Sequence, residues 1–225
     1  MDRVSVQTNV LKANQEAARE NRRLFEREGT VVINLMSAPG AGKTSLLEAT
    51  IRGLRDRCHL AVIEGDLQTD LDAQRIRDLG VRSHQITTGT VCHLDARMVA
   101  RALVEFSLRG VELLVIENVG NLICPASYDL GESLRVVICS VAEGAEKPKK
   151  YPVMFHKADV VVLNKTDLAI ASRVDLRELE KNVREVNPKA TVFALSCTTG
   201  EGLNAWFAWL RDAIASRSIT AAAGT

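Results

Sequence analysis

The feature that most constrains this chain is a glycine-containing octapeptide, SAPGAGKT, at residues 37–44. It fits the phosphate-loop pattern except at its first position, where Ser37 stands in place of glycine. An apolar run at 31–36 precedes it, and leucines at helical spacing follow it over 46–54. A strand-to-helix loop of small residues lets backbone N–H groups and the helix N-terminus surround an oxyanion. The octapeptide therefore predicts a phosphate site within an α/β architecture.

Short apolar runs alternate with helix-length segments along the rest of the chain. The runs lie at 31–36, 60–63, 113–116, 136–138, 160–163 and 191–195. Continuous runs rich in β-branched residues are typical of parallel strands that are buried on both faces. We therefore predict an α/β fold with a mostly parallel sheet and helices on both faces.

The length of 225 residues suits one α/β domain with a well-buried core. The polar segment from about Val4 to Glu28, which precedes the first apolar run, has the composition of a surface helix that ends near Gly29. The last helical pattern runs roughly over 203–215, and a small, polar tail follows. We predict an N-terminal helical extension over 1–29, a phosphate-loop domain over 30–217 and a flexible tail over 218–225.

The composition is that of an ordinary globular protein, with 46% hydrophobic residues, 25% charged residues and a formal net charge of +1. Such a small net charge would not attract a polyanion, so we expect no nucleic-acid partner. No apolar stretch reaches membrane-spanning length, and the N-terminus lacks the layout of a secretion signal. The five cysteines are scattered and odd in number, which argues against a disulfide framework. We expect a cytoplasmic protein with reduced thiols and no membrane partner.

The phosphate-loop pattern predicts a role for two of its side chains, Lys43 and Thr44. Lys43 would place its charge between the outer phosphates, and the Thr44 hydroxyl is suited to Mg²⁺. A strand-to-helix turn without a ligand is the alternative, but the lysine, the hydroxyl and the flanking spacing agree on a nucleotide. The loop residues expected to contact it are Ala38, Pro39, Gly40, Ala41, Gly42, Lys43, Thr44 and Ser45.

The choice of base is indicated by Asn164-Lys165-Thr166-Asp167, which follows a predicted buried strand. Asp167 can accept hydrogen bonds from N1–H and the exocyclic amine of guanine, a pair that adenine does not offer. Alone, this tetrapeptide is commonly just a loop. Its place after a phosphate loop, with Ser196-Cys197-Thr198 at the next strand end, favours GTP. The residues predicted at the base are Asn164, Lys165, Asp167, Ser196 and Cys197.

Acidic residues follow two further predicted strands, in Glu64-Gly65-Asp66 and in Glu117-Asn118-Val119-Gly120. Phosphoryl transfer needs Mg²⁺ against the β- and γ-phosphate oxygens and a water aligned for attack. Asp70 or Asp72 could orient that water, although a solvated acid at a helix N-terminus explains each equally well. We assign Mg²⁺ to Thr44, Asp66 and Glu117. The predicted catalytic residues are Lys43, Asp66, Asp70 and Glu117.

A second kind of site is suggested by Cys92 and His93, just before a predicted helix, and by Cys124, four residues after Gly120. Adjacent side chains can turn toward one ion at a loop-to-helix junction. Thiolate and imidazole donors suit Zn²⁺ or Ni²⁺. The alternative is that both cysteines pack as small apolar residues and that His93 caps a turn. The spacing alone leaves these two interpretations equal.

The segments CHLDA at 92–96 and ENVGNLICPA at 117–126 closely resemble the HypB family of hydrogenase nickel-incorporation GTPases. The resemblance extends from about Val31 to Gly202. It implies a SIMIBI-type GTPase, related to the nitrogenase iron protein, that hydrolyses GTP slowly to GDP and forms a homodimer with GTP. It also implies Ni²⁺ or Zn²⁺ at the subunit interface and nickel delivery to [NiFe]-hydrogenase. The implied partners are a HypA-type nickel chaperone and the hydrogenase large-subunit precursor.

Carried over to this sequence, the resemblance places Cys92, His93 and Cys124 at the family's nickel- or zinc-binding positions. It therefore favours metal binding over simple packing. Lys149 and Lys150 fall in a segment that, by resemblance, reaches the partner subunit's nucleotide, with a solvated basic loop as the alternative. Lys150 is accordingly added to the nucleotide-binding residues.

Three departures from the family matter. The N-terminus is neither cysteine-rich nor histidine-rich, so high-affinity nickel storage is not expected. Arg97 stands where some members have a further histidine, and Ala38 stands where relatives such as the iron protein have an activating lysine. Two other functions stay open. One is a urease-type nickel-delivery GTPase, whose Cys-Pro-His motif is absent here, and the other is a nucleotide-gated scaffold without essential turnover.

Overall fold

The computed structural model describes residues 3–66 and 71–222, with side chains described over 9–66 and 74–216. These residues form one seven-stranded sheet in the order β3-β2-β4-β1-β5-β6-β7, and every neighbouring pair is parallel. The predicted fold class is therefore confirmed. The strands are β1 (Val31–Ser37), β2 (Leu60–Asp66), β3 (Arg82–Thr87), β4 (Leu113–Glu117), β5 (Leu134–Ser140), β6 (Val160–Asn164) and β7 (Thr191–Ala194).

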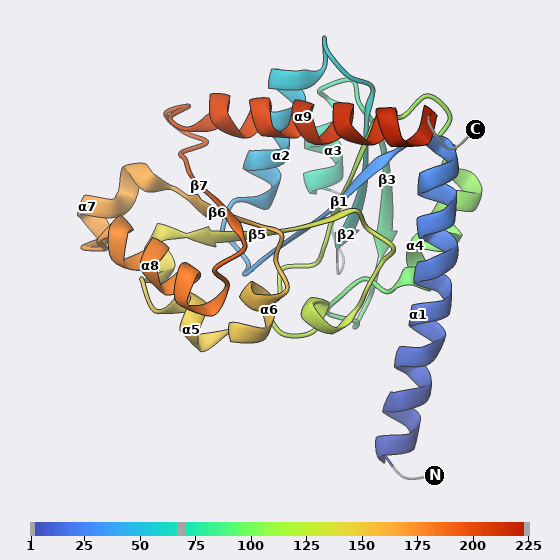
Figure 1. Ribbon diagram of the computed structural model, residues 1–225, viewed down its shortest axis with the longest axis horizontal. Helices are drawn as coiled ribbons and strands as arrows, with labels where there is room; N and C mark the ends of the chain where they lie inside the picture. The colour runs from blue at the N-terminus through green and yellow to red at the C-terminus, as the bar shows by residue number, and fades with distance from the viewer. Residues whose placement is uncertain (1–2, 67–70, 223–225) are drawn as a thin grey trace.

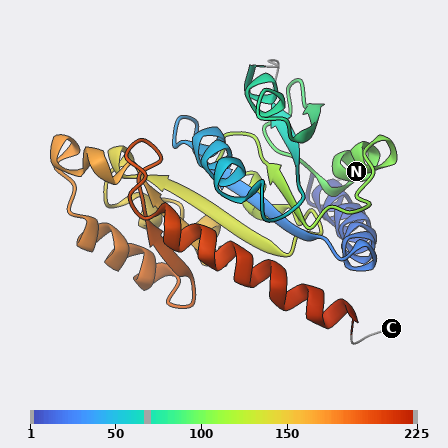
Figure 2. The ribbon, with the colours of Figure 1, turned by 90° about the horizontal axis from the view of Figure 1, so that it is seen from above.

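Helices cover both faces of the sheet (Figures 1 and 2). They are α1 (Arg3–Glu28), α2 (Lys43–Leu54), α3 (Leu71–Arg77), α4 (Ala96–Glu105), α5 (Lys147–Lys150), α6 (Pro152–His156), α7 (Ala169–Ser172), α8 (Leu176–Val186) and α9 (Leu203–Ala222). Three single turns of 3-10 helix lie at Pro125–Ser127, Val141–Glu143 and Thr166–Leu168. The N-terminal part of α1 extends beyond the rest of the molecule (Figure 1).

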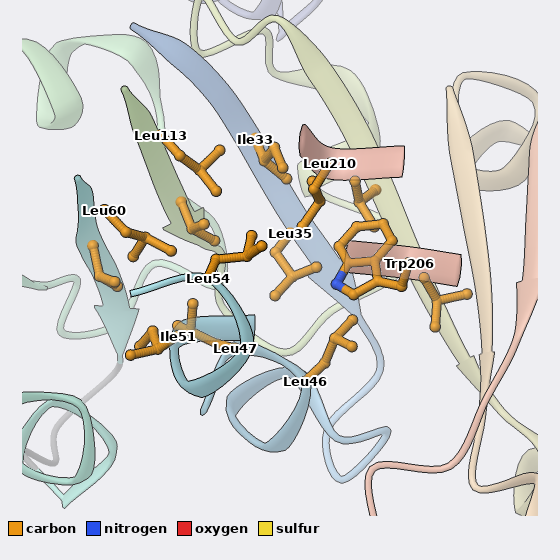
Figure 3. Packing of buried hydrophobic residues seen from close by; sticks show 14 of the residues in the cluster. Ile33, Leu35, Leu46, Leu47, Ile51, Leu54, Leu60, Leu113, Trp206 and Leu210 are labelled. Carbon is orange, nitrogen blue, oxygen red and sulfur yellow. The ribbon is translucent and has the colours of Figure 1, made fainter. Parts of the chain in front are cut away.

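The main core lies between β1 and the two helices α2 and α9 (Figure 3). Alternate residues of β1, such as Ile33 and Leu35, point into it, and Trp206 of α9 packs beside them. The indole N–H of Trp206 donates to Thr50 Oγ1 at 2.9 Å, which ties α9 to α2. Since α2 begins at the phosphate loop, this packing fixes the direction in which that loop points.

Two elements differ from the sequence-based expectation. The strand β3 was not predicted, because it lies at the sheet edge and carries the mixed sequence RSHQIT instead of an apolar run. The last helix, α9, continues to Ala222 and so extends past the predicted end at 215. No proline or glycine interrupts the sequence over 203–222, so nothing in that segment stops the helix. Within the described part of the chain, no helix has the length and apolar character needed to cross a membrane.

Candidate nucleotide and metal site

The carboxyl ends of β1, β2 and β4 surround a cavity of about 450 Å³. Its walls are the phosphate loop, residues 64–66, residues 117–120, Arg75 and Lys165. Ligands of open α/β sheets bind at this edge, where the loops that follow neighbouring strands converge. The structure thus brings the phosphate loop and both predicted acidic sites together around one space.

The phosphate loop depends on glycine at two positions. Gly40 and Gly42 have φ values of 74° and 102°, in the left-handed region that favours glycine. At Gly42 there is also no room for a side chain, because a Cβ would overlap Asn164 Nδ2. That amide donates to Ala41 O at 3.0 Å, and Lys165 Nζ donates to Gly40 O at 2.7 Å. The first two side chains of the segment 164–167 therefore donate hydrogen bonds directly to the phosphate loop.

The two charged or polar groups expected at the phosphates already have protein partners. Lys43 Nζ donates a hydrogen bond to Ser37 Oγ at 3.3 Å. The acceptor is therefore the serine that stands in place of the usual glycine. Thr44 Oγ1 donates to Glu117 Oε1 at 3.0 Å, and both residues are buried. Asp66 lines the same cavity. This set of hydroxyl and carboxylate oxygens fits Mg²⁺, which prefers oxygen ligands.

The residues predicted at the base also converge. Ser196 Oγ donates to Asp167 Oδ1 at 2.5 Å and accepts the N–H groups of residues 198 and 199. These contacts orient the carboxylate. Burial raises the pKa of the adjacent Cys197 thiol to about 11, so this cysteine is a neutral neighbour of the site.

The two lysines that the resemblance places near a nucleotide do not line this cavity. Lys150 is in α5, where its Nζ pairs with Glu146 at 3.1 Å, and Lys149 Nζ pairs with Glu185 at 2.8 Å. Asp70 lies outside the residues that the structure describes, as does the side chain of Asp72. No position for an attacking water is therefore assigned to either acid.

The three predicted metal ligands form one cluster beside this site. The Sγ atoms of Cys92 and Cys124 are 3.1 Å apart, and one ligand atom of each of the three residues lies within 4.8 Å of the others. Both cysteines are free thiols. His93 Nδ1 is buried and has no hydrogen-bond partner among the described residues. Two thiols, an imidazole and an unsatisfied buried nitrogen fit a thiophilic ion such as Ni²⁺ or Zn²⁺.

The electrostatics of the cluster differ between its members. The pKa of Cys124 is raised, first by the hydrogen bond with Cys92 and then by burial. Burial lowers the pKa of His93 and outweighs the opposing charge of Asp95, so the imidazole is neutral and available as a ligand near pH 7. The ring of His93 stacks on Tyr128, with the ring centroids 4.0 Å apart.

Two loops carry this cluster. The metal loop, residues 91–95, ends where Asp95 caps α4 by accepting the N–H of Met98 at 2.8 Å. The switch loop, residues 117–124, begins at Glu117 and ends at Cys124. Asn121 Nδ2 of the switch loop donates to Cys92 O at 3.3 Å. The two loops are thus joined by a side-chain-to-backbone hydrogen bond as well as by the contact between their thiols.

The helix α1 contacts Ala96, the first residue of α4, which directly follows the metal loop. Asn14 Oδ1 accepts the N–H of Ala96 at 2.8 Å, and Asn21 Nδ2 donates to Ala96 O at 2.9 Å. Both asparagines are buried. Sequence reasoning missed them, along with Asn118, Asn121 and Tyr128. Only Asn118 and Asn121 could have been found from the sequence, because they lie in the segment 117–126 that carries the family resemblance.

Comparison with known proteins is consistent with this geometry. A family model described as "CobW/HypB/UreG, nucleotide-binding domain" matches residues 31–194. The hydrogenase maturation factor HypB of Rhizobium leguminosarum bv. viciae is 48% identical over 216 residues, which cover 96% of this chain and 72% of that protein. The hydrogenase/urease maturation factor HypB of Helicobacter pylori is 41% identical over 197 residues, which cover 86% of this chain and 81% of that protein.

Solved structures agree with the sequence matches. HypB from Archaeoglobus fulgidus superposes with a TM-score of 0.85 and 39% identity, covering 90% of this chain and 99% of that one. HypB from Helicobacter pylori in complex with nickel superposes with a TM-score of 0.86 and 38% identity, covering 92% of this chain and 97% of that one. FlhF complexed with GMPPNP and Mg²⁺, with a TM-score of 0.52 and 16% identity, shares the fold alone and covers 74% of this chain and 66% of that one.

Proposed function

The chain belongs to the CobW/HypB/UreG family and, within it, to the HypB hydrogenase maturation factors, and from this premise we propose that it is a GTP-hydrolysing metallochaperone. Its cargo is Ni²⁺, with Zn²⁺ as the other ion that the ligands suit, and its task is nickel insertion into [NiFe]-hydrogenase. It acts as a GTP-dependent homodimer in the cytoplasm, with a HypA-type nickel chaperone and the hydrogenase large-subunit precursor as partners.

One observation carries this proposal: the switch loop contributes to both sites. Glu117 at its beginning contacts Thr44 of the phosphate-loop helix, and Cys124 at its end lies 3.1 Å from Cys92. A change at the γ-phosphate therefore has a path of only eight residues to the metal cluster. This arrangement supports a nucleotide-controlled metal site better than it supports two independent sites.

The chain's own residues divide the nucleotide work between them. Lys43 leaves Ser37 to contact the outer phosphates, while Asp167, oriented by Ser196, binds the guanine edge. Thr44, Asp66 and Glu117 would hold Mg²⁺, which supplies neutralisation of the phosphate charge during hydrolysis. In the proposed dimer, ligands from two copies of the cluster meet across a two-fold axis.

The decisive experiment measures Ni²⁺ and Zn²⁺ affinity of the full chain by chelator competition without nucleotide, with GDP and with a non-hydrolysable GTP analogue. We expect affinity to depend on nucleotide and to be lost in Cys92→Ala and Cys124→Ala. Unchanged affinity in both variants would remove the metal half of the proposal. GTP turnover is measured alongside for the wild type and Lys43→Ala, and intact GTP binding without measurable turnover would favour the nucleotide-gated scaffold.

Delivery of nickel to a urease is a second candidate, because the Helicobacter pylori relative is a hydrogenase/urease maturation factor. The two candidates share the nucleotide and metal sites and differ in the receiving enzyme. Nickel transfer from the loaded protein to the apo form of each enzyme, measured in parallel with ⁶³Ni, separates them. Incorporation into urease and none into the hydrogenase precursor would decide for the second candidate.

A further inference from the structure

The side chain of Asn118 is the buried point at which the switch loop meets the metal loop. Its main-chain N–H donates to Leu35 O at 3.0 Å, so its backbone continues the sheet ladder. Its Oδ1 accepts the N–H of Leu94 at 3.0 Å. Asn118 is 1% exposed and Leu94 is fully buried. One hydrogen bond therefore joins the residue after Glu117 to the residue after His93.

The orientation of this amide is fixed by a chain of buried partners. Asn118 Nδ2 donates to Asn34 Oδ1 at 3.1 Å, and Asn34 Nδ2 donates to Glu132 Oε1 at 3.3 Å. Arg135 Nε also donates to Glu132 Oε1, at 2.7 Å. Because the Asn34 amide N–H group faces an acceptor, its oxygen must face Asn118, and the Asn118 oxygen must then face the metal loop. Only one orientation of the two side-chain amides therefore satisfies all of these hydrogen bonds.

The metal loop is also seated on the strand that carries the other magnesium-site acid. The side chain of Leu94 packs directly on Gly65, where a built Cβ would lie 2.7 Å from Leu94 Cγ. Gly65 is adjacent to Asp66 in β2. Leu94 therefore contacts the ends of both β2 and β4, and it cannot move independently of either.

We propose that Asn118 is a positioning residue that couples the state of the nucleotide site to the geometry of the metal loop. This inference rests on the proposed function, because it needs a metal site that responds to nucleotide. A displacement of Glu117 moves the neighbouring Asn118, which moves the Leu94 amide and with it the adjoining ligands of the metal loop. Without the asparagine side chain, the two loops keep their own ligands and lose this connection.

The test is the ratio of Ni²⁺ affinities with a GTP analogue and with GDP, measured by chelator competition on the full chain. We expect a ratio that differs from one by about fivefold or more in the wild type. In Asn118→Ala the ratio of the two Ni²⁺ affinities, each measured at saturating nucleotide, falls to within about twofold of one. Asn118→Asp, which keeps an oxygen for the Leu94 amide, retains more of the coupling than Asn118→Ala.

Asn182→Ala is the matched control, because Asn182 is equally a buried asparagine that donates one hydrogen bond, to Ala145 O at 2.9 Å, away from both sites. It keeps the wild-type ratio. If Asn118→Ala also keeps that ratio, the inference is overturned and the proposed function stands. If the wild type has a ratio of one, both are overturned.

A second measurement needs no variant and so does not depend on folding of Asn118→Ala. Amide hydrogen exchange of Leu94 in the wild type is followed with GDP and with the GTP analogue, in the absence of metal. We expect at least a threefold difference in exchange rate between the two nucleotide states, because the N–H of Leu94 reports on its bond to Asn118. Equal rates in both states would contradict the role of Asn118.

Discussion

Thr44 Oγ1 donates to Glu117 Oε1 at 3.0 Å, so the first turn of α2 is hydrogen-bonded to the end of β4. Both side chains are buried. Since buried polar groups need partners, this contact satisfies the Thr44 hydroxyl and one carboxylate oxygen of Glu117. Two of the three residues proposed to hold Mg²⁺ are therefore in direct contact with each other.

Thr44→Val tests this contact, because valine keeps the shape of threonine and removes the hydroxyl. We expect Mg²⁺-dependent GTP affinity to fall by about tenfold or more, since one oxygen ligand and one hydrogen bond are lost. Thr44→Ser keeps the hydroxyl and should stay within about threefold of the wild type. Titration of a fluorescent GTP analogue with and without Mg²⁺ measures both, and equal Mg²⁺ dependence in wild type and Thr44→Val would count against the assignment.

Gly42→Ala should abolish nucleotide binding without unfolding the protein. The added Cβ would overlap Asn164 Nδ2, and the residue has φ 102°. Gly110→Ala is the matched control, because Gly110 has φ 75° and nothing within 4 Å of a built Cβ. It carries the backbone strain alone, about 1–2 kcal/mol. We expect Gly110→Ala to lower thermal stability and keep GTP affinity, and loss of GTP binding in both variants would rule out the steric explanation.

Asp167→Asn should change base preference from GTP to XTP. In the proposed function the Asp167 carboxylate would accept from guanine N1–H and the exocyclic amine, whereas an asparagine amide can donate to the carbonyl that xanthine has in place of that amine. We expect GTP affinity to fall by about 100-fold or more and XTP affinity to rise. Competition between the two nucleotides measures the change. If the variant still prefers GTP, Asp167 does not read the base.

Tyr128→Ala should weaken metal binding although Tyr128 offers no ligand to the cluster. The tyrosine ring stacks on His93 at a centroid distance of 4.0 Å and restricts the imidazole to one orientation. Loss of a hydrogen bond that orients a metal ligand typically costs about 10–100-fold in metal affinity, and we expect the loss of this stacking contact to cost about tenfold. Tyr128→Phe keeps the stacking and should bind Ni²⁺ as the wild type does. Equal affinities for the alanine and phenylalanine variants would show that the stacking has no such role.

Metal affinity should fall as the pH falls. The raised pKa of Cys124 means that its thiol is protonated near pH 7, so metal binding must release that proton. His93, whose pKa is lowered, is already neutral there and releases none. We expect affinity to decrease by about tenfold per pH unit for each thiol proton displaced between pH 8 and pH 6. Proton release is measured in weak buffer as Ni²⁺ is added, and binding without proton release would exclude thiolate ligation.

Much of the fold could be predicted because the sheet is buried on both faces. Six of the seven strands are apolar runs, and the runs at 31–36 and 160–163 lie inside β1 and β6. The edge strand β3 could not be found in this way, since its sequence RSHQIT is not an apolar run, whereas the other edge strand, β7, has the sequence TVFA. A strand could therefore be predicted only where its sequence is an apolar run.

The supporting residues of the site could not be predicted because they act through contacts between distant segments. Asn118 and Asn34 are 84 positions apart, and Asn21 and Ala96 are 75 positions apart. No spacing rule connects such pairs. The phosphate loop could be recognised because its pattern lies within one short segment, and the family resemblance singled out Cys92, His93 and Cys124. An asparagine that bonds two loops looks like any other polar residue.

The 3.1 Å separation of the Cys92 and Cys124 thiols has a consequence in redox terms. A disulfide needs the two sulfur atoms at about 2.05 Å, so little movement separates this pair of ligands from a covalent bond. Removal of two electrons and two protons by an oxidant would leave neither sulfur as a thiolate and would tie the metal loop to the switch loop. The proposed binding of a soft metal ion at this pair therefore requires an environment that keeps both thiols reduced.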